Sequence, residues 1–106
     1  MQSWSHINVY QMNERMNDPS LTILDIRESF ELELASIDST VHIPMGDIPN
    51  QLEKLDKSKT WVIMCHTGVR SLVVCDFLSQ HGYSVLNFLG GIHAWSMQID
   101  TSIPIY

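Results

Sequence analysis

Short blocks of apolar residues alternate along the chain with segments that carry helix signals. The blocks at 21–26 and 60–64 are mostly apolar and rich in β-formers, as strands buried on both faces are. We expect strands at 7–9, 21–26, 41–43, 60–64 and 84–89, and helices at 9–16, 30–35, 47–55, 71–80 and 92–98. Because strands alternate with helices, the pattern predicts an α/β fold with a mainly parallel five-stranded sheet that is flanked by helices on both faces.

Several residues at the ends of these segments support their bounds. Asn8 can cap the first helix, and Ser29 occupies the expected N-cap position before 30–35. Gly82 is expected to stop the helix that precedes it, as a residue just past a helix end often does. The segment 47–55 is expected to form a short amphipathic helix. Its apolar face would consist of Ile48, Leu52 and Leu55.

A loop with a single cysteine joins the expected strand 60–64 to the expected helix 71–80. It consists of Cys65, His66, Thr67, Gly68, Val69 and Arg70, and Ser71 follows it. This order aims backbone N–H groups and the positive end of a helix dipole at the loop, so a thiol there should ionise easily. Gly68 allows unusual backbone angles, and Arg70 adds a cation. We interpret the loop as a nucleophilic cysteine in an anion cradle.

Other loops are expected to meet the cysteine loop at one edge of the sheet. Ligands of parallel sheets bind outside the carboxyl ends of the strands, and the segments 25–28 and 90–91 follow strands as Cys65 does. Asp25 and Arg27 are expected to support the loops through charge-assisted hydrogen bonds. The lysines of the chain enter from the opposite edge, so a bound anion would depend on N–H groups and Arg70. Those lysines are Lys54, Lys57 and Lys59.

Composition and charge narrow the range of functions. The 106 residues fit one domain, residues 1–106. The net charge is -6 with six Lys and Arg, which argues against nucleic acid or a membrane surface as partner. With no export signal or spanning apolar stretch, we expect a cytoplasmic protein with reduced cysteines. Cys75 is expected to pack in the core, and no metal ligand set or cofactor motif is visible.

Four motifs make the sequence resemble a single-domain rhodanese, of the small bacterial thiosulfate sulfurtransferase type. The family's early motif appears as Asp25-Ile26-Arg27-Glu28 followed by Glu31-Leu32, and its His-Ile-Pro element as Val41-His42-Ile43-Pro44. The six-residue loop Cys-x-x-Gly-x-Arg, followed by Ser, spans Cys65 to Ser71, and the closing motif is Gly90-Gly91-Ile92-His93-Ala94-Trp95. Their order and spacing make the resemblance specific.

The resemblance implies a rhodanese-like three-layer fold and a sulfur-transfer cycle. The Cys65 thiolate would take sulfur from a small sulfur-containing anion or a persulfide donor, and the N–H groups of residues 66–70 would stabilise the resulting persulfide. The sulfur would then pass to cyanide, a thiol or a sulfur-relay protein. Many active members carry Arg or Lys directly after the cysteine. Because His66 stands there, we expect weak thiosulfate turnover and a persulfide as the donor.

Two alternatives belong to other functional classes. Phosphatases and arsenate reductases with a similar fold use a loop one residue longer, wide enough for a tetrahedral oxyanion, so the six residues from Cys65 to Arg70 favour sulfur. Non-catalytic sulfur-binding or sensing modules of this fold have usually lost the cysteine, which is present here. Hydrolysis of an aryl phosphate would favour the first alternative, and an unreactive Cys65 would favour the second.

Overall fold

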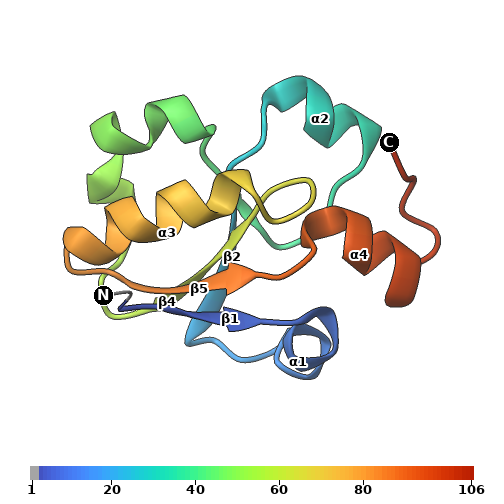
Figure 1. Ribbon diagram of the computed structural model, residues 1–106, viewed down its shortest axis with the longest axis horizontal. Coiled ribbons are helices and arrows are strands. Elements are labelled where there is room, and N and C mark those ends of the chain that lie inside the picture. Colours follow the sequence, from blue (N-terminus) through green and yellow to red (C-terminus); the bar gives the residue numbers. More distant parts are fainter. Residues whose placement is uncertain (1–2) are drawn as a thin grey trace.

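The computed structural model describes residues 3–106 and contains one parallel five-stranded sheet (Figure 1). The strands are β1 (Ser5–Ile7), β2 (Leu21–Asp25), β3 (Val41–His42), β4 (Thr60–Met64) and β5 (Ser84–Phe88). The α-helices are α1 (Val9–Glu14), α2 (Ser29–Leu34), α3 (Arg70–Gln80) and α4 (Gly91–Gln98). The strand order is β1-β5-β4-β2-β3, with every neighbouring pair parallel. The predicted α/β fold class is confirmed.

The sheet separates two hydrophobic cores because side chains alternate between its faces. Ile63 of β4 packs with α3, whereas its neighbours Val62 and Met64 pack with α1 and α4. Figure 1 shows α3 and α1 on opposite sides of the strands. Cys75 is buried in one of these cores, as expected, and Trp95 is buried in the other. Among residues 3–106, no helix combines the length and apolar character needed to cross a membrane.

The expected amphipathic helix at 47–55 is wrong. The chain instead forms two 3₁₀ turns, η1 (Met45–Asn50) and η2 (Leu52–Lys54), with Pro49 inside the first. Proline lacks an N–H group and its ring clashes with the carbonyl of residue i−4, so an α-helix that begins at Met45, where this turn begins, cannot continue through Pro49. Ile48 and Leu55 are nevertheless buried, so the apolar pattern correctly marked core positions.

The start of α2 differs from the expectation, whereas the start of α1 agrees with the expected cap and shortens the first strand. Ser29 is the first residue of α2, and Glu28 takes the N-cap position. The Glu31 carboxylate accepts a hydrogen bond from the N–H of Glu28 at 3.1 Å, which ties the N-cap residue to the third residue of the helix. Asn8 caps α1 as expected and accepts from the N–H of Gln11 at 2.8 Å. Because α1 begins at Val9, the first strand ends at Ile7 instead of continuing to residue 9.

Candidate active site

The cysteine loop leaves the carboxyl end of β4, the central strand of the sheet. Cys65 follows β4 directly, and α3 begins at Arg70. The neighbouring strands β2 and β5 end on either side, so the segments after them lie at the same edge. The convergence expected from the sequence is therefore observed.

The first turn of α4 fixes the cysteine loop from behind. The N–H groups of Ile92 and His93 donate to the carbonyl oxygens of Cys65 and His66 at 3.1 and 3.0 Å. Gly91 has a φ of 60°, and a Cβ there would lie 2.5 Å from the same two carbonyl oxygens. Only glycine allows the two backbones to approach this closely, which explains Gly91 as the first residue of α4.

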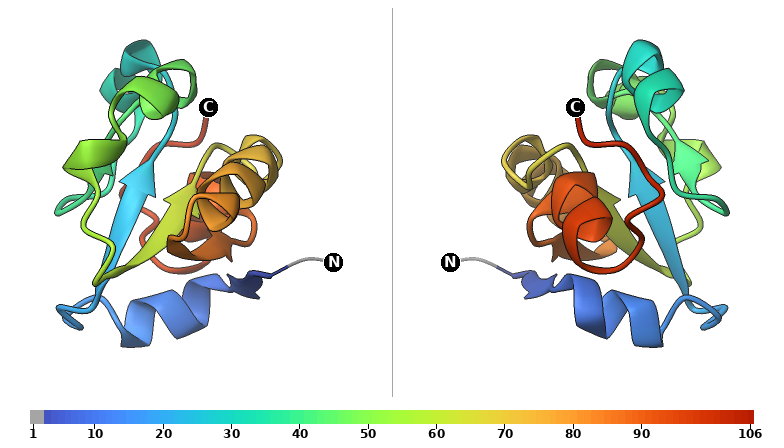
Figure 2. Two further views of the ribbon diagram at one scale, coloured as in Figure 1. Left: turned by 90° about the vertical axis from the view of Figure 1, so that its left-hand side faces the viewer. Right: turned by 90° about the vertical axis from the view of Figure 1, so that its right-hand side faces the viewer.

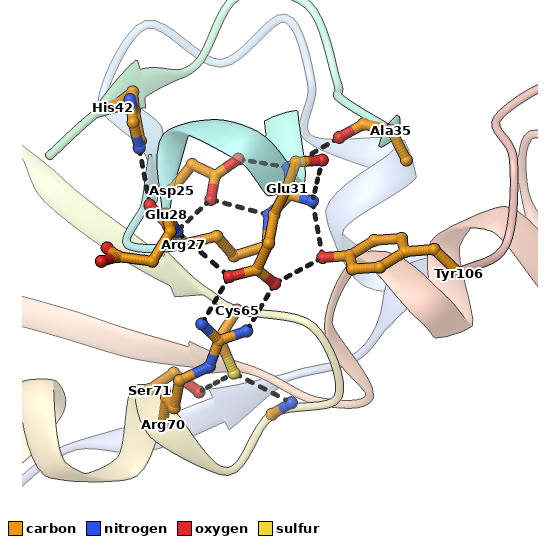
Figure 3. A network of polar contacts seen from close by, with 11 residues as sticks. Asp25, Arg27, Glu28, Glu31, Ala35, His42, Cys65, Arg70, Ser71 and Tyr106 are labelled. Carbon is orange, nitrogen blue, oxygen red and sulfur yellow. Dashed lines mark hydrogen bonds and ion pairs between the residues drawn. The ribbon is translucent and has the colours of Figure 1, made fainter. Parts of the chain in front are cut away.

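The Cys65 side chain lies in a ring of hydrogen-bonding groups inside the loop. The residue is 1% exposed. Its Sγ accepts from the N–H of Gly68 at 3.1 Å and lies 3.6 Å from the Ser71 Oγ (Figure 3). Burial alone raises the pKa of the Cys65 thiol, but hydrogen bonding to Ser71 and to the N–H groups of Ser71, Gly68 and Thr67 outweighs burial and lowers it. The loop therefore favours a thiolate.

Arg70 is held by a carboxylate from α2 and is not a free cation. Its Nη1 and Nη2 donate to the two carboxylate oxygens of Glu31 at 2.7 and 2.8 Å (Figure 3). The hydrogen bonds from Arg70 lower the pKa of Glu31 to about 2. Burial opposes this change, whereas hydrogen bonds from Tyr106 and from the N–H of Glu28 add to it. Glu31 in turn raises the pKa of Arg70. The positive charge beside the cysteine loop is thus largely neutralised.

Asp25 and Arg27 form a buried ion pair that braces the loop after β2. Arg27 Nη2 donates to the Asp25 carboxylate at 2.7 Å and also to the Ala35 carbonyl at 2.9 Å. Arg27 Nε donates to the other Asp25 oxygen at 2.9 Å, and both residues are 0% exposed. These are the charge-assisted hydrogen bonds expected from the sequence. They join the end of β2 to the C-terminal end of α2, which carries Glu31.

Tyr106 completes the site from the far end of the chain. Its hydroxyl donates to Glu31 at 2.8 Å and accepts from Arg27 Nη1 at 2.8 Å. Its ring stacks on His66, with centroids 4.0 Å apart and an angle of 8° between the planes. The segment after α4 runs back towards α2 to place this ring (Figure 2). Nε2 of His66 is buried and has no hydrogen-bond partner among the described residues.

The remaining loop residues and the functional residues missed by the sequence analysis can now be placed. Thr67 and Val69 are exposed at the tip of the loop. The sequence marks Glu31 only as part of a motif, without a role at the site. Nothing in the sequence indicates that Tyr106 or Asn87 belongs to the site. Across residues 3–106, no group of three or more His, Cys, Asp or Glu side chains is arranged to hold a metal ion. The arrangement suits a thiolate or persulfide that is stabilised by N–H groups.

Comparison with known proteins gives consistent results. Residues 8–98 match the family described as "Rhodanese-like domain". The chain is 44% identical over 78 residues to the "Putative sulfurtransferase YtwF" of Bacillus subtilis, covering 74% of this chain and 76% of that protein. It is 36% identical over 81 residues to the "Putative sulfur carrier protein YrkF" of the same organism, covering 76% of this chain but 44% of YrkF.

A similar solved structure is that of a rhodanese-related protein from Thermoplasma volcanium. It has a TM-score of 0.84 and 32% sequence identity, and the match covers 90% of this chain and 93% of that chain. Together, the similarities support a sulfurtransferase role.

Proposed function

The chain belongs to the rhodanese-like domain family, and on that basis we propose that it transfers sulfane sulfur through a persulfide on Cys65. The observation that carries this proposal is the geometry of the sulfur. A cysteine at the end of the central strand accepts the N–H of Gly68, and hydrogen bonding lowers the pKa of its thiol despite burial. Such a group is a prepared nucleophile that needs no separate general base.

The cycle consists of two displacement steps on sulfur. In the first, the Cys65 thiolate attacks the outer sulfur of the donor. A new S–S bond forms, and the donor's own bond to that sulfur breaks with its electron pair, leaving sulfite or a thiolate. In the second, an acceptor nucleophile attacks the terminal sulfur, and the Cys65 thiolate is released. The sulfur keeps its oxidation level throughout, so the cycle needs no external oxidant or cofactor.

The loop can stabilise the intermediate as well as the thiolate. The persulfide is anionic, and backbone N–H groups that point into the loop are donors fixed before the reaction. In this proposal the N–H groups of residues 66–70 bind the terminal sulfur, Ser71 supports the inner sulfur, and Asp25 and Arg27 hold the surrounding loops. Arg70 acts mainly by positioning α2, because its guanidinium is bound to Glu31.

The charges at the site favour a persulfide over thiosulfate as donor. Thiosulfate is a dianion, and the Glu31 carboxylate neutralises the arginine nearest the loop. His66 is stacked under Tyr106 where many relatives carry a fixed cation. We therefore propose a thiol persulfide as the preferred donor and a thiol as the acceptor, with cyanide as the acceptor in vitro. We also propose a sulfur-relay protein as a partner, because the similar protein YrkF is named "Putative sulfur carrier protein".

Intact-protein mass spectrometry tests the proposal directly. The protein is incubated with thiosulfate or with glutathione persulfide, and the mass is measured before and after treatment with cyanide. We expect a gain of one sulfur atom, larger with the persulfide and removed by cyanide. The matched variants are Cys65→Ser, which should gain nothing, and Cys75→Ser, which should behave as wild type because Cys75 is buried in the core.

Three results would contradict the proposal. A sulfur gain that persists in Cys65→Ser would place the chemistry elsewhere. Loss of the gain in a folded Cys75→Ser variant would implicate the second thiol. Failure of wild type to gain sulfur from either donor would favour a non-catalytic module.

A further inference from the structure

A chain of side-chain hydrogen bonds leads from the candidate nucleophile, beside the central strand β4, to the edge strand β1. Cys65 Sγ lies 3.6 Å from Ser71 Oγ, which donates to Asn87 Oδ1 at 2.5 Å. Asn87 Nδ2 lies 3.2 Å from His6 Nδ1. The first three residues are at most 1% exposed, whereas His6 is exposed to solvent. The chain therefore connects a buried sulfur to a side chain in contact with water.

The strand register explains how these residues meet. Asn87 lies in β5, between β1 and β4, and pairs directly with His6 of the edge strand β1. Ser71 belongs to the first turn of α3, directly after the cysteine loop. Three elements distant in sequence thus contribute one link each.

One arrangement of donors and acceptors along these contacts fits a neutral thiol. The Cys65 S–H donates to Ser71 Oγ, and the Ser71 hydroxyl donates its single proton to the Asn87 carbonyl oxygen. The amide N–H₂ of Asn87 then faces His6 Nδ1, which must be an unprotonated acceptor in this arrangement. At each link, the group nearer the sulfur is the donor and the group nearer the surface is the acceptor.

A thiolate requires the opposite directions. The Ser71 hydroxyl can stabilise a negative sulfur only by turning its one proton towards it. Asn87 must then turn its amide, so that Nδ2–H donates to Ser71 Oγ and Oδ1 faces His6. That oxygen is satisfied only if His6 carries a proton on Nδ1. Otherwise two acceptors face each other at a part-buried contact, which is costly.

We propose that Asn87 is a positioning residue whose amide orientation couples the charge of the Cys65 sulfur to the protonation of Nδ1 of His6. This inference deepens the proposed function, on which it rests. When the thiol ionises, its proton leaves to water. Exposed His6 releases a proton from Nε2 and takes one up at Nδ1, so one proton is released in total. A donor at position 6 therefore favours the thiolate, and an acceptor there opposes it.

Other ionisable groups surround both ends of this hydrogen-bond chain and must be held constant in a test. Near the sulfur are Arg70 and Cys75 of α3, Glu31 bound to Arg70, and the imidazoles of His66 and His93. Near His6, a cavity of about 290 Å³ is lined in part by Glu14 and Arg15 of the α1 region. All of these groups remain in every variant below, so differences between variants report on the chain itself.

The experiment compares His6→Asp with His6→Asn, two nearly isosteric side chains whose terminal atoms fall where Nδ1 lies. Asp is only an acceptor, so it holds the Asn87 N–H₂ towards position 6 and the Ser71 proton away from sulfur. Asn can donate or accept. The readout is the rate of Cys65 alkylation by iodoacetamide against pH. At fixed pH below the midpoint, we expect His6→Asp to react about three- to tenfold more slowly than His6→Asn.

A simple charge effect of Asp has the same sign, so two controls separate the explanations. At 1 M salt, interactions between exposed charges are screened within about 3 Å, but an orientation passed through hydrogen bonds is not. We expect the difference to persist in salt and to disappear in the Asn87→Leu background. A difference that vanishes in 1 M salt, or that survives in a folded Asn87→Leu protein, would overturn the proposal. The salt comparison decides alone if Asn87→Leu does not fold.

A second measurement observes the chain in the wild-type protein. The nitrogen chemical shifts of His6 report which ring nitrogen carries the proton. As Cys65 ionises, neutral His6 should shift towards the form protonated on Nδ1, and in Cys65→Ser it should not. An unchanged proton position would contradict the coupling. These readouts need no sulfur donor. The absence of coupling between Cys65 and His6 can therefore be distinguished from the absence of sulfur transfer.

Discussion

Replacing Glu31 by Gln removes the carboxylate that neutralises Arg70 and should destabilise the protein at neutral pH. The drop in the pKa of Glu31 from 4.5 to about 2 corresponds to roughly 3 kcal/mol of native-state stabilisation. The Arg70 side chain is 37% exposed, and solvent screening there reduces the expected value to about 2 kcal/mol. We expect Glu31→Gln to lower the free energy of unfolding by that amount at pH 7.

The pH dependence gives the sharper test because its sign is fixed by the direction of the pKa change. The native carboxylate ionises more readily than the unfolded one, so its contribution is complete above the unfolded pKa of about 4.5. It is lost as pH falls from there to about 2. Urea unfolding of wild type and Glu31→Gln should therefore show a gap at pH 7 that narrows towards pH 3.

The matched control is Glu33→Gln, which removes the same charge from an exposed position on α2. It should change stability by no more than a few tenths of a kcal/mol. A gap for Glu31→Gln that stays constant from pH 7 to pH 3, or that equals the gap for Glu33→Gln, would refute the assigned role of this ion pair. We also expect Glu31→Gln to raise the rate with thiosulfate relative to the rate with a persulfide, since the freed Arg70 would attract a dianion.

Two further substitutions test the parts that hold the loop. Tyr106→Phe keeps the aromatic ring but leaves Arg27 Nη1 with only a 3.4 Å hydrogen bond to the Glu31 carbonyl. Thermal unfolding should therefore show a free energy of unfolding that is lower by about 1–2 kcal/mol. An unchanged melting temperature would contradict this. Gly91→Ala places a Cβ 2.5 Å from two carbonyl oxygens of the cysteine loop and should abolish sulfur transfer, whereas Gly46→Ala, with nothing within 4 Å, should not. Equal activity of the two alanine variants would show that close packing behind the loop is unimportant.

The sheet was predictable because its strands are short, apolar and separated by clear boundary signals. The blocks at 21–26 and 60–64 became β2 and β4 with an error of at most one residue at either end. The segment 47–55 does not form the helix that its apolar spacing predicts. The turn begins at Met45, and Pro49 cannot donate a hydrogen bond to the Met45 carbonyl oxygen. The helix α2 begins one residue before the expected start, because the Glu31 side chain reaches back to the N–H of Glu28 and makes Glu28 the N-cap.

The sequence by itself determined the fold class and the position of the candidate nucleophile. A strand, a six-residue loop and a helix follow one another without interruption, so local backbone geometry places Cys65 at the end of a buried strand. The same local order provides the N–H donor of Gly68. These features depend on residues close together in the chain, and periodicity and glycine positions are sufficient to read them.

Only the tertiary structure decided which charges neutralise each other at the site and which side chains lie over it. Glu31 and Arg70 are 39 positions apart, and Tyr106 lies 75 positions from Glu31. Asn87 and His6 are separated by 81 positions. Whether such side chains meet depends on strand order and on the path of the segment after α4, which local propensity does not encode. The physical reason is that hydrogen bonds and ion pairs act over a few ångströms of space, regardless of distance along the chain.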